Sequence, residues 1–442
     1  MGTVYFVHCV DTEGPLYESL TATFDDMERV FGIRLEPTAD NLAKVQAGVG
    51  MPEAQRAPMM ARYAKARLNY NRDWAMIDRM HETLFSREFR ESIVDDRGQS
   101  YALSWFCLDQ VGFDENPRRR SLGYHVVFDY YADLSRRHPE TRDELYWHFH
   151  PVAFNRRANC QGLSIQNHSL HLQSLSRRLL DREHFSAAFR PGYHQEKTDL
   201  NLFLEQWFPF DYANLNGADH QNQPRRAFRY IDWRHAPTEW RPYHPSFADA
   251  GTPGDLRRWV SRTLTLSTNF CSLTRDEMVK AFVDAEHRDV LVSVCSHDNR
   301  DMVEEIRELW ALINDSRQVA KSRAELVFST AVGGFVGALG LDRRPLEVDL
   351  TVTGDECVVQ VRGDMFSLQP FLCFRTASGE YWHDNMSRGD TPQSFFYVFD
   401  EQTVPLRGID KLGVAVTSPS GEVVMSFYQP LDGRTWSRRL CE

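Results

Sequence analysis

Short apolar runs alternate with amphipathic stretches through the first 340 residues. Each run is rich in β-branched and aromatic side chains and ends in polar residues, as a buried strand does. We expect strands at residues 4–10, 101–108, 144–149, 187–190, 211–215 and 290–295. Apolar positions at helical spacing predict helices at residues 59–68, 73–85, 129–137, 170–180, 198–207, 302–313 and 322–339. Strands alternating with helices indicate a parallel α/β barrel or sheet, in which ligands bind at the carboxyl ends of the strands.

The pattern changes after a boundary at residues 340–345. From residue 346 onward, strand-like runs are separated by turn signals, which predicts an antiparallel β-sandwich. Because 442 residues exceed one ordinary core, we expect a catalytic domain at 1–340 and a separate sandwich at 346–442 without catalytic side chains. Residues 216–254, rich in Pro, Trp, Tyr, His and Arg, are expected to form a long loop over the site. The glycine cluster at 333–340 is interpreted as a helix end.

Four of the predicted strands end in residues that can carry chemistry. Asp11 and Glu13 follow the first strand, and the pair His148 and His150 ends the third. The fourth strand supplies Arg190, and the last supplies His297. Each residue alone has an ordinary structural explanation, such as a cap, a turn or a buried histidine. Parallel strands bring their carboxyl ends to one mouth, so we expect these side chains to meet.

Two neutral imidazoles and one carboxylate are a typical ligand set for a divalent metal, with zinc as the expected ion. His148 and His150 would be ligands together with Asp11 or Glu13. The other carboxylate would act as the base, and Arg190 would keep it ionised. His297 would give a proton to the leaving group, with the neighbouring Asp298 or a more distant residue orienting its ring. The sequence leaves open which of the two carboxylates is the ligand.

The same motifs resemble the polysaccharide deacetylase family, the carbohydrate esterases with the NodB-homology barrel. They read VDTEGP at 10–15, HFHP at 148–151, FRPGY at 189–193 and SHD at 296–298, within residues 1–300. Two features depart from the usual motifs: Thr12 separates the two acidic residues, and the histidines are two positions apart. This form looks like a divergent branch associated with the assembly of bacterial surface glycans.

The resemblance implies a deformed (β/α) barrel and a metal-dependent deacylase. Its substrate would be an acetylated or formylated amino sugar of a surface-glycan precursor, as in O-antigen or capsule biosynthesis. Substrate contacts are expected from Tyr193 and His194 in the third motif, and from Tyr243 and His244 in the segment WRPYHPS. Two alternatives stay open, a glycoside hydrolase on a similar barrel and a non-catalytic glycan-binding protein.

Composition narrows the class of partner. With 51 Lys and Arg against 62 Asp and Glu, the net charge of −11 argues against a nucleic-acid binder. No apolar run is long enough for a membrane helix, and the start lacks the pattern of a signal peptide. The eight cysteines form no C-x-x-C pair, so we expect a reduced, cytoplasmic setting. The sequence carries no signal for an oligomeric state.

Overall fold

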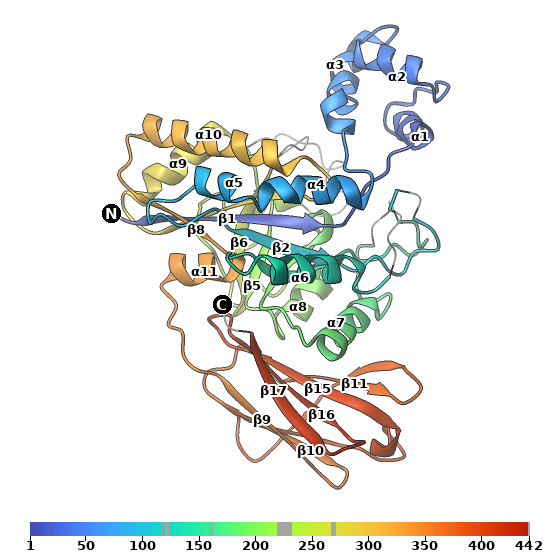
Figure 1. Ribbon diagram of the computed structural model, residues 1–442, viewed down its shortest axis with the longest axis vertical. Coiled ribbons are helices and arrows are strands. Elements are labelled where there is room, and N and C mark those ends of the chain that lie inside the picture. Colours follow the sequence, from blue (N-terminus) through green and yellow to red (C-terminus); the bar gives the residue numbers. More distant parts are fainter. Residues whose placement is uncertain are drawn as a thin grey trace.

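Seven parallel strands close into a barrel in the computed structural model, which describes residues 1–116, 118–119, 123–158, 160, 162–218, 232–266 and 271–440. The strands follow chain order around the barrel, and the seventh pairs back onto the first (Figure 1). They are β1 (Thr3–Thr12), β2 (Leu103–Leu108), β3 (Glu144–Phe149), β4 (Ala188–Pro191), β5 (Phe210–Asn214), β6 (Trp259–Thr265) and β7 (Val290–His297). The predicted fold class, a deformed (β/α) barrel followed by antiparallel sheets, is confirmed.

The deformation lies at β1, whose second edge is shared by two strands. Its first half, Thr3 to Val7, pairs with an added strand β8 (Glu325–Ser329), and its second half, His8 to Thr12, pairs with β2. The prediction of a helix over 322–339 is therefore wrong for its first part. The buried side chains of β8 complete the edge of β1 at the level where β2 has not yet begun.

The helices lie around the barrel and at its two ends. They are α1 (Leu20–Phe31), α2 (Ala39–Gln46), α3 (Glu53–Arg62), α4 (Trp74–Leu84), α5 (Arg87–Ser92), α6 (Val126–Arg137), α7 (Leu170–Arg182), α8 (Thr198–Leu204), α9 (Arg275–Ala285), α10 (Met302–Ala320) and α11 (Ala331–Leu339), with 3₁₀ turns η1 (Lys65–Leu68), η2 (Gly192–His194), η5 (Trp233–His235) and η6 (Leu406–Gly408). Side-chain oxygens of Asp73, Thr274 and Thr330 cap the first turns of α4, α9 and α11. Within the described part of the chain, no helix is long and apolar enough to cross a membrane.

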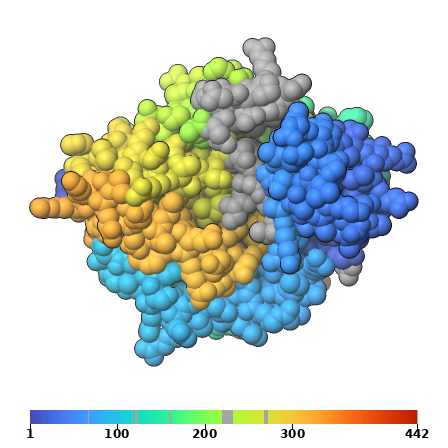
Figure 2. All heavy atoms as spheres, turned by 90° about the horizontal axis from the view of Figure 1, so that it is seen from above, coloured from blue at the N-terminus to red at the C-terminus, as the bar shows by residue number. Residues whose placement is uncertain are grey.

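Helices α1 to α3 form a small group of their own after β1. Phe24, Met27, Val45, Met59 and Tyr63 contribute to a hydrophobic cluster separate from the barrel core. Both views place this group at the end of the barrel toward which β1 points (Figures 1 and 2). The insertion therefore stands on the side of the barrel where the strands finish.

Helix α11 packs against the opposite, amino-terminal end of the barrel strands. Gly333, Gly334 and Gly337 lie inside the helix, whereas Gly340, in a left-handed conformation, marks its end as expected. A Cβ atom on Gly334 would lie 2.4 Å from Val7 Cγ2, and one on Gly337 would lie 2.2 Å from Tyr5 Cε1. Glycine at these two positions lets the helix backbone approach β1 closely enough to cover this end of the barrel.

The C-terminal residues form two antiparallel sheets. One has the order β13-β14-β10-β9 and the other the order β12-β11-β15-β16-β17. The strands are β9 (Glu347–Thr353), β10 (Glu356–Arg362), β11 (Phe371–Thr376), β12 (Tyr381–Asp384), β13 (Ser387–Arg388), β14 (Ser394–Val398), β15 (Ile409–Thr417), β16 (Val423–Gln429) and β17 (Arg434–Leu440). Buried residues of both sheets share one hydrophobic cluster, as in a sandwich.

The five-stranded sheet also packs against the barrel side. Along β11, Leu372 and Phe374 belong to the sandwich core, while Phe371 belongs to a cluster shared with barrel residues. The Phe371 ring lies 5.2 Å from each of the rings of Phe185 and Trp207. The sandwich thus contributes to the packing of the barrel, and independent folding of 1–340 and 346–442 stays a prediction.

The aromatic segment expected to cover the site includes 219–231, which lie outside the described residues. Part of the remainder lies in the barrel wall. Tyr243 and Val260 of β6 exchange backbone hydrogen bonds, and the Leu291 N–H of β7 donates to the Trp240 carbonyl. This segment therefore fills the gap between the first halves of β6 and β7, which pair directly only from Thr263 onward.

Candidate metal centre at the barrel mouth

The interior of the barrel becomes polar toward its mouth. Side chains alternate between the two faces of a strand, so every second residue of β1 points into the barrel. Val7 and Cys9 belong to the interior apolar cluster, Asp11 follows with its carboxylate bound by an arginine of β4, and Glu13 continues the row just past the strand end. The sequence Cys-x-Asp-x-Glu, which runs along β1 and one residue past its end, thus places its two carboxylates at successive levels of the barrel wall.

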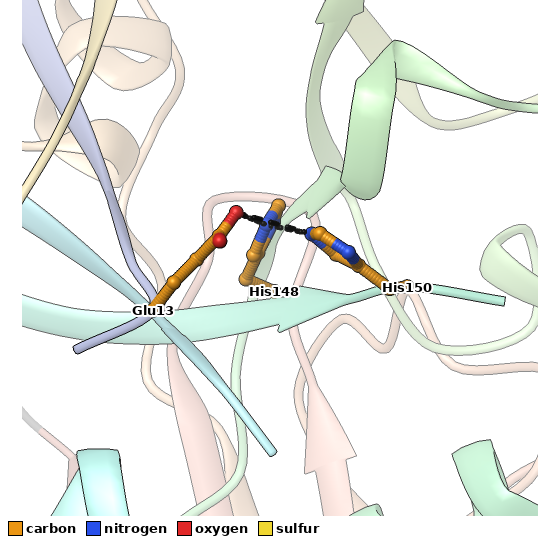
Figure 3. Close-up of side chains that lie close together, drawn as sticks. All are labelled: Glu13, His148 and His150. Atoms are coloured by element: carbon orange, nitrogen blue, oxygen red, sulfur yellow. Dashed lines mark hydrogen bonds and ion pairs between the residues drawn. The ribbon is translucent and has the colours of Figure 1, made fainter. Parts of the chain in front are cut away.

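Glu13, His148 and His150 form a cluster able to hold a metal ion. The two Nε2 atoms of the histidines are 2.9 Å apart, and Glu13 Oε1 lies 3.4 Å from the His150 nitrogen and 4.0 Å from the His148 nitrogen. Figure 3 shows the carboxylate facing both rings from a different strand end. H-x-H on one strand places both rings on the same face, which explains why residues two apart can share one ion.

The protonation of His148 suits a ligand. Its Nδ1 lies 2.8 Å from the Arg190 carbonyl oxygen, so Nδ1 carries the proton and Nε2 presents its lone pair to the cluster. Burial lowers the pKa of this fully buried ring to about 4, which keeps the imidazole neutral at neutral pH. Gly192 adds a second sign of fit, since a Cβ there would lie 2.2 Å from the His150 ring. Two imidazole nitrogens and a carboxylate oxygen are a donor set that zinc accepts.

Asp11 lies outside this cluster and pairs with Arg190. The Arg190 Nε donates to Asp11 Oδ1 at 2.6 Å, and the same oxygen lies 3.8 Å from Nδ1 of His148, which already donates to the Arg190 carbonyl and is not the nitrogen that faces the cluster. Burial would raise the pKa of the Asp11 carboxyl, but the charge and hydrogen bond of Arg190, together with His148 and His297, outweigh burial and lower the pKa. Asp11 is therefore an ionised carboxylate beside the cluster of Glu13, His148 and His150.

The Arg190 guanidinium is held in place by several hydrogen-bond acceptors. Besides Asp11, its guanidinium donates to the Tyr212 carbonyl at 2.8 Å and to His194 Nε2 at 2.9 Å. His194 in turn donates from Nδ1 to the Ala213 carbonyl at 3.1 Å, so both of its ring nitrogens are engaged inside the protein. The buried His194 thus supports the arginine, and its expected contact with substrate stays a prediction.

Tyr193 lies at the open side of the cluster. Its ring is 5.0 Å from the His150 ring, and the residue is 47% exposed. Both Tyr193 and His194 have a φ of 54°, a strained region for residues with side chains. Such strain is commonly kept at functional sites, where it turns side chains in a required direction. Here it turns one ring toward the mouth and the other toward Arg190.

His297 ends β7 opposite Asp11. Its Nε2 lies 3.8 Å from Asp11 Oδ2, and the side chain is 28% exposed. Burial lowers the pKa of His297, while the charges of Asp11 and Glu13 raise it in part. The ring is therefore within reach of both the carboxylate pair and the open mouth.

One site residue carries no signal in the sequence. Arg119, in the segment between β2 and α6, forms an ion pair with Glu13 Oε2 and donates to the Gly14 carbonyl at 2.9 Å. Burial would raise the pKa of Glu13, but the Arg119 charge, together with His150 and His297, lowers this pKa well below its usual value. A lone arginine in a polar segment belongs to no motif, and only the fold brings it to the mouth.

Tyr243 and His244 lie away from this cluster in the barrel wall. Tyr243 is hydrogen-bonded through its backbone to Val260 near the start of β6. The centroid of the His244 ring lies 3.6 Å from that of Trp259, the first residue of that strand. Their expected role in substrate binding stays a prediction.

No protein-family model, curated protein or solved structure matches the chain. The barrel and its mouth therefore support one coarse conclusion: this is an α/β-barrel protein with a possible metal site made of Glu13, His148 and His150.

Proposed function

We propose that the protein is a metal-dependent deacylase that removes an acetyl or formyl group from an amino sugar of a surface-glycan precursor. The observation that carries this proposal is the meeting of the Glu13–His148–His150 cluster with an ionised carboxylate, Asp11, and a third histidine, His297, at one end of the barrel. The motif resemblance to polysaccharide deacetylases supports the choice of reaction and of substrate class.

In this proposal Glu13, His148 and His150 hold a divalent ion, with zinc as the favoured one. Such an ion supplies Lewis-acid chemistry, by polarising the acyl carbonyl and lowering the pKa of water. Asp11 takes the proton from the attacking water as general base. Arg190 keeps Asp11 ionised and fixes its orientation through the 2.6 Å hydrogen bond.

His297 is proposed to protonate the leaving amine, which departs poorly as an anion. Because its pKa is lowered, the resting ring must gain a proton during the reaction. Asp11 Oδ2, 3.8 Å from Nε2, is a suitable source once it has taken the proton from water. Tyr193 is proposed to contact the sugar, because its ring is exposed beside His150.

A glycoside hydrolase fits the carboxylates less well. Two such carboxyl groups flank the scissile bond from opposite sides. Asp11 and Glu13 instead lie two residues apart, one near the end of β1 and one just past it, and each is paired with an arginine.

The decisive experiment measures acetate or formate release from N-acylated amino sugars, free and nucleotide-linked. Protein stripped by chelator should be inactive, and one equivalent of zinc should restore turnover. His148→Ala should abolish both zinc binding and turnover, whereas the matched exposed variant His287→Ala should keep both. Zinc-loaded protein that releases no acyl group, or that cleaves a glycosidic bond, would contradict the proposal.

A further inference from the structure

The carboxylate of Glu13 lies on a turn that the barrel sheet does not hold. Thr12 is the last residue of β1 and the last to pair with β2. Beyond it the chain turns through Gly14, whose φ is +73°. The position of Glu13 relative to His148 and His150 therefore depends on contacts other than the strand ladder.

Asp298 supplies such contacts. Its Oδ1 accepts the Glu13 N–H at 3.0 Å, and its Oδ2 accepts the Gly14 N–H at 2.9 Å. Oδ2 also accepts the Tyr131 hydroxyl at 3.0 Å. One fully buried carboxylate thus binds two successive N–H groups of the turn and links them to helix α6.

Asp298 is itself held in place. The Asn71 side-chain amide donates to the Asp298 carbonyl at 2.9 Å, which fixes the backbone from the segment before α4. Asp298 lies just past the end of β7, and its carboxylate is turned to Tyr131 and the Glu13–Gly14 backbone, whereas the His297 ring lies near Asp11. Orientation of His297 by Asp298, one of the two options left by the sequence, finds no support in the hydrogen bonds of the described residues.

The carbonyl groups of the turn are bound as well. The Gln110 side-chain amide donates to the Glu13 carbonyl at 3.0 Å, and Arg119 donates to the Gly14 carbonyl at 2.9 Å. The contacts to Asp298 are charge-assisted, as is the one from Arg119, and Asp298 alone of these residues accepts both N–H groups of the turn. Hydrogen bonds from backbone N–H groups to a carboxylate are stronger than neutral ones, and an amide at the same place would turn a donor toward another donor.

We propose that Asp298 is a positioning residue that fixes the Glu13–Gly14 turn and so sets the affinity of the centre for its metal. This inference rests on the proposed metal-dependent function. It assigns Asp298 neither a ligand nor a proton-transfer role, because its carboxylate oxygens are occupied by the turn and by Tyr131.

Asp298→Asn tests the inference, with Asp301→Asn as its matched control. Asp301 lies three residues further on, and its carboxylate also accepts two backbone N–H groups, those of Val303 and Glu304 at the start of α10. Among the described residues, its side chain forms no hydrogen bond or ion pair with Glu13 or Gly14. Both variants lose a carboxylate that binds backbone N–H groups, but only the carboxylate of Asp298 binds the turn that carries Glu13.

Zinc affinity is measured by competition with a chromophoric chelator, and stability by thermal unfolding of the same samples. We expect Asp298→Asn to weaken zinc binding by roughly 10–100-fold, the usual effect of losing a residue that orients a ligand. Asp301→Asn should leave both zinc affinity and melting temperature close to those of the wild type, because an asparagine oxygen caps the first turn of α10 about as well as an aspartate oxygen. An Asp298→Asn protein that loses stability but binds zinc like the wild type would overturn the inference and leave the metal site intact.

A second variant covers the case in which Asp298→Asn does not fold. Tyr131→Phe removes only the hydroxyl that Asp298 accepts, and it should speed amide hydrogen exchange at Glu13 and Gly14 and weaken zinc binding by a smaller factor. Unchanged exchange and unchanged affinity in folded Tyr131→Phe would overturn the inference. A wild-type protein that binds no zinc would overturn the proposed function and this inference together.

Discussion

Replacing each carboxylate of β1 by its amide separates the roles that the sequence leaves open for Asp11 and Glu13. Glu13 Oε1 lies 3.4 Å and 4.0 Å from the two Nε2 atoms of the cluster. Asp11 instead faces Nδ1 of His148, which already donates to the Arg190 carbonyl. Glu13→Gln should therefore remove a metal ligand, and Asp11→Asn should remove none.

The expected loss of zinc affinity in Glu13→Gln follows from the number of ligands that share the binding free energy. Zinc sites with four ligands have apparent binding free energies of about 10–16 kcal/mol, so one ligand contributes about 3–4 kcal/mol. Glu13→Gln should thus raise the Kd for zinc by roughly 10²–10³-fold. Asp11→Asn should raise it by about tenfold at most, because it removes only a nearby charge that Arg190 partly neutralises. At saturating zinc, Asp11→Asn should still lower kcat by roughly 10²–10⁴-fold, the usual contribution of a general base.

The assay combines chelator competition for the Kd with acyl release at a fixed, saturating concentration of free zinc. Glu36→Gln makes the same carboxyl-to-amide change at an exposed position and serves as the control. Its affinity and turnover should match those of the wild type. Equal losses of zinc affinity in Glu13→Gln and Asp11→Asn, or a larger loss in Asp11→Asn, would refute the assignment of Glu13 as ligand.

Three further expectations test the site and the fold. His297→Gln should keep metal content and fold while kcat falls by roughly 10²–10⁴-fold, and near-normal turnover of an amide substrate would exclude His297 as the proton donor. Gly334→Ala should lower the free energy of unfolding by about 1–3 kcal/mol in denaturant unfolding, because its Cβ would meet Val7. Gly333→Ala in the same helix should be close to neutral. Equal effects of the two substitutions would argue against close packing of α11. A chain ending at residue 340 should melt at a lower temperature than the full protein, because Trp207 and its neighbours lose their apolar contacts with β11. An unchanged melting temperature would show that the sandwich does not contribute to the stability of the barrel.

For the site, the sequence predicts much of the ligand set but not its internal assignment. His148 and His150 could be selected because two residues of equal parity on one strand point the same way. The same rule puts Asp11 and Glu13 on one face, but it does not say at what depth the imidazoles lie. The partners of each carboxylate separate them: Arg190 approaches Asp11 from β4, and Arg119 approaches Glu13 from the segment before α6. Those approaches depend on neighbouring strands and loops that no local pattern specifies.

For the fold, the buried runs ending in polar residues were enough to predict a parallel α/β barrel and a β-rich C-terminal part, because periodicity and turn residues act locally. The pairing of β8 with the lower half of β1, the passage of the 240–243 segment between β6 and β7, and the seating of α11 on Val7 and Tyr5 became visible only in three dimensions. In each case the segment forms hydrogen bonds to a free strand edge or packs over an uncovered end of the barrel. Such vacancies exist only once the other strands are in place, so the sequence determined which residues could form the barrel and its metal centre, and tertiary packing decided which gap each remaining segment fills.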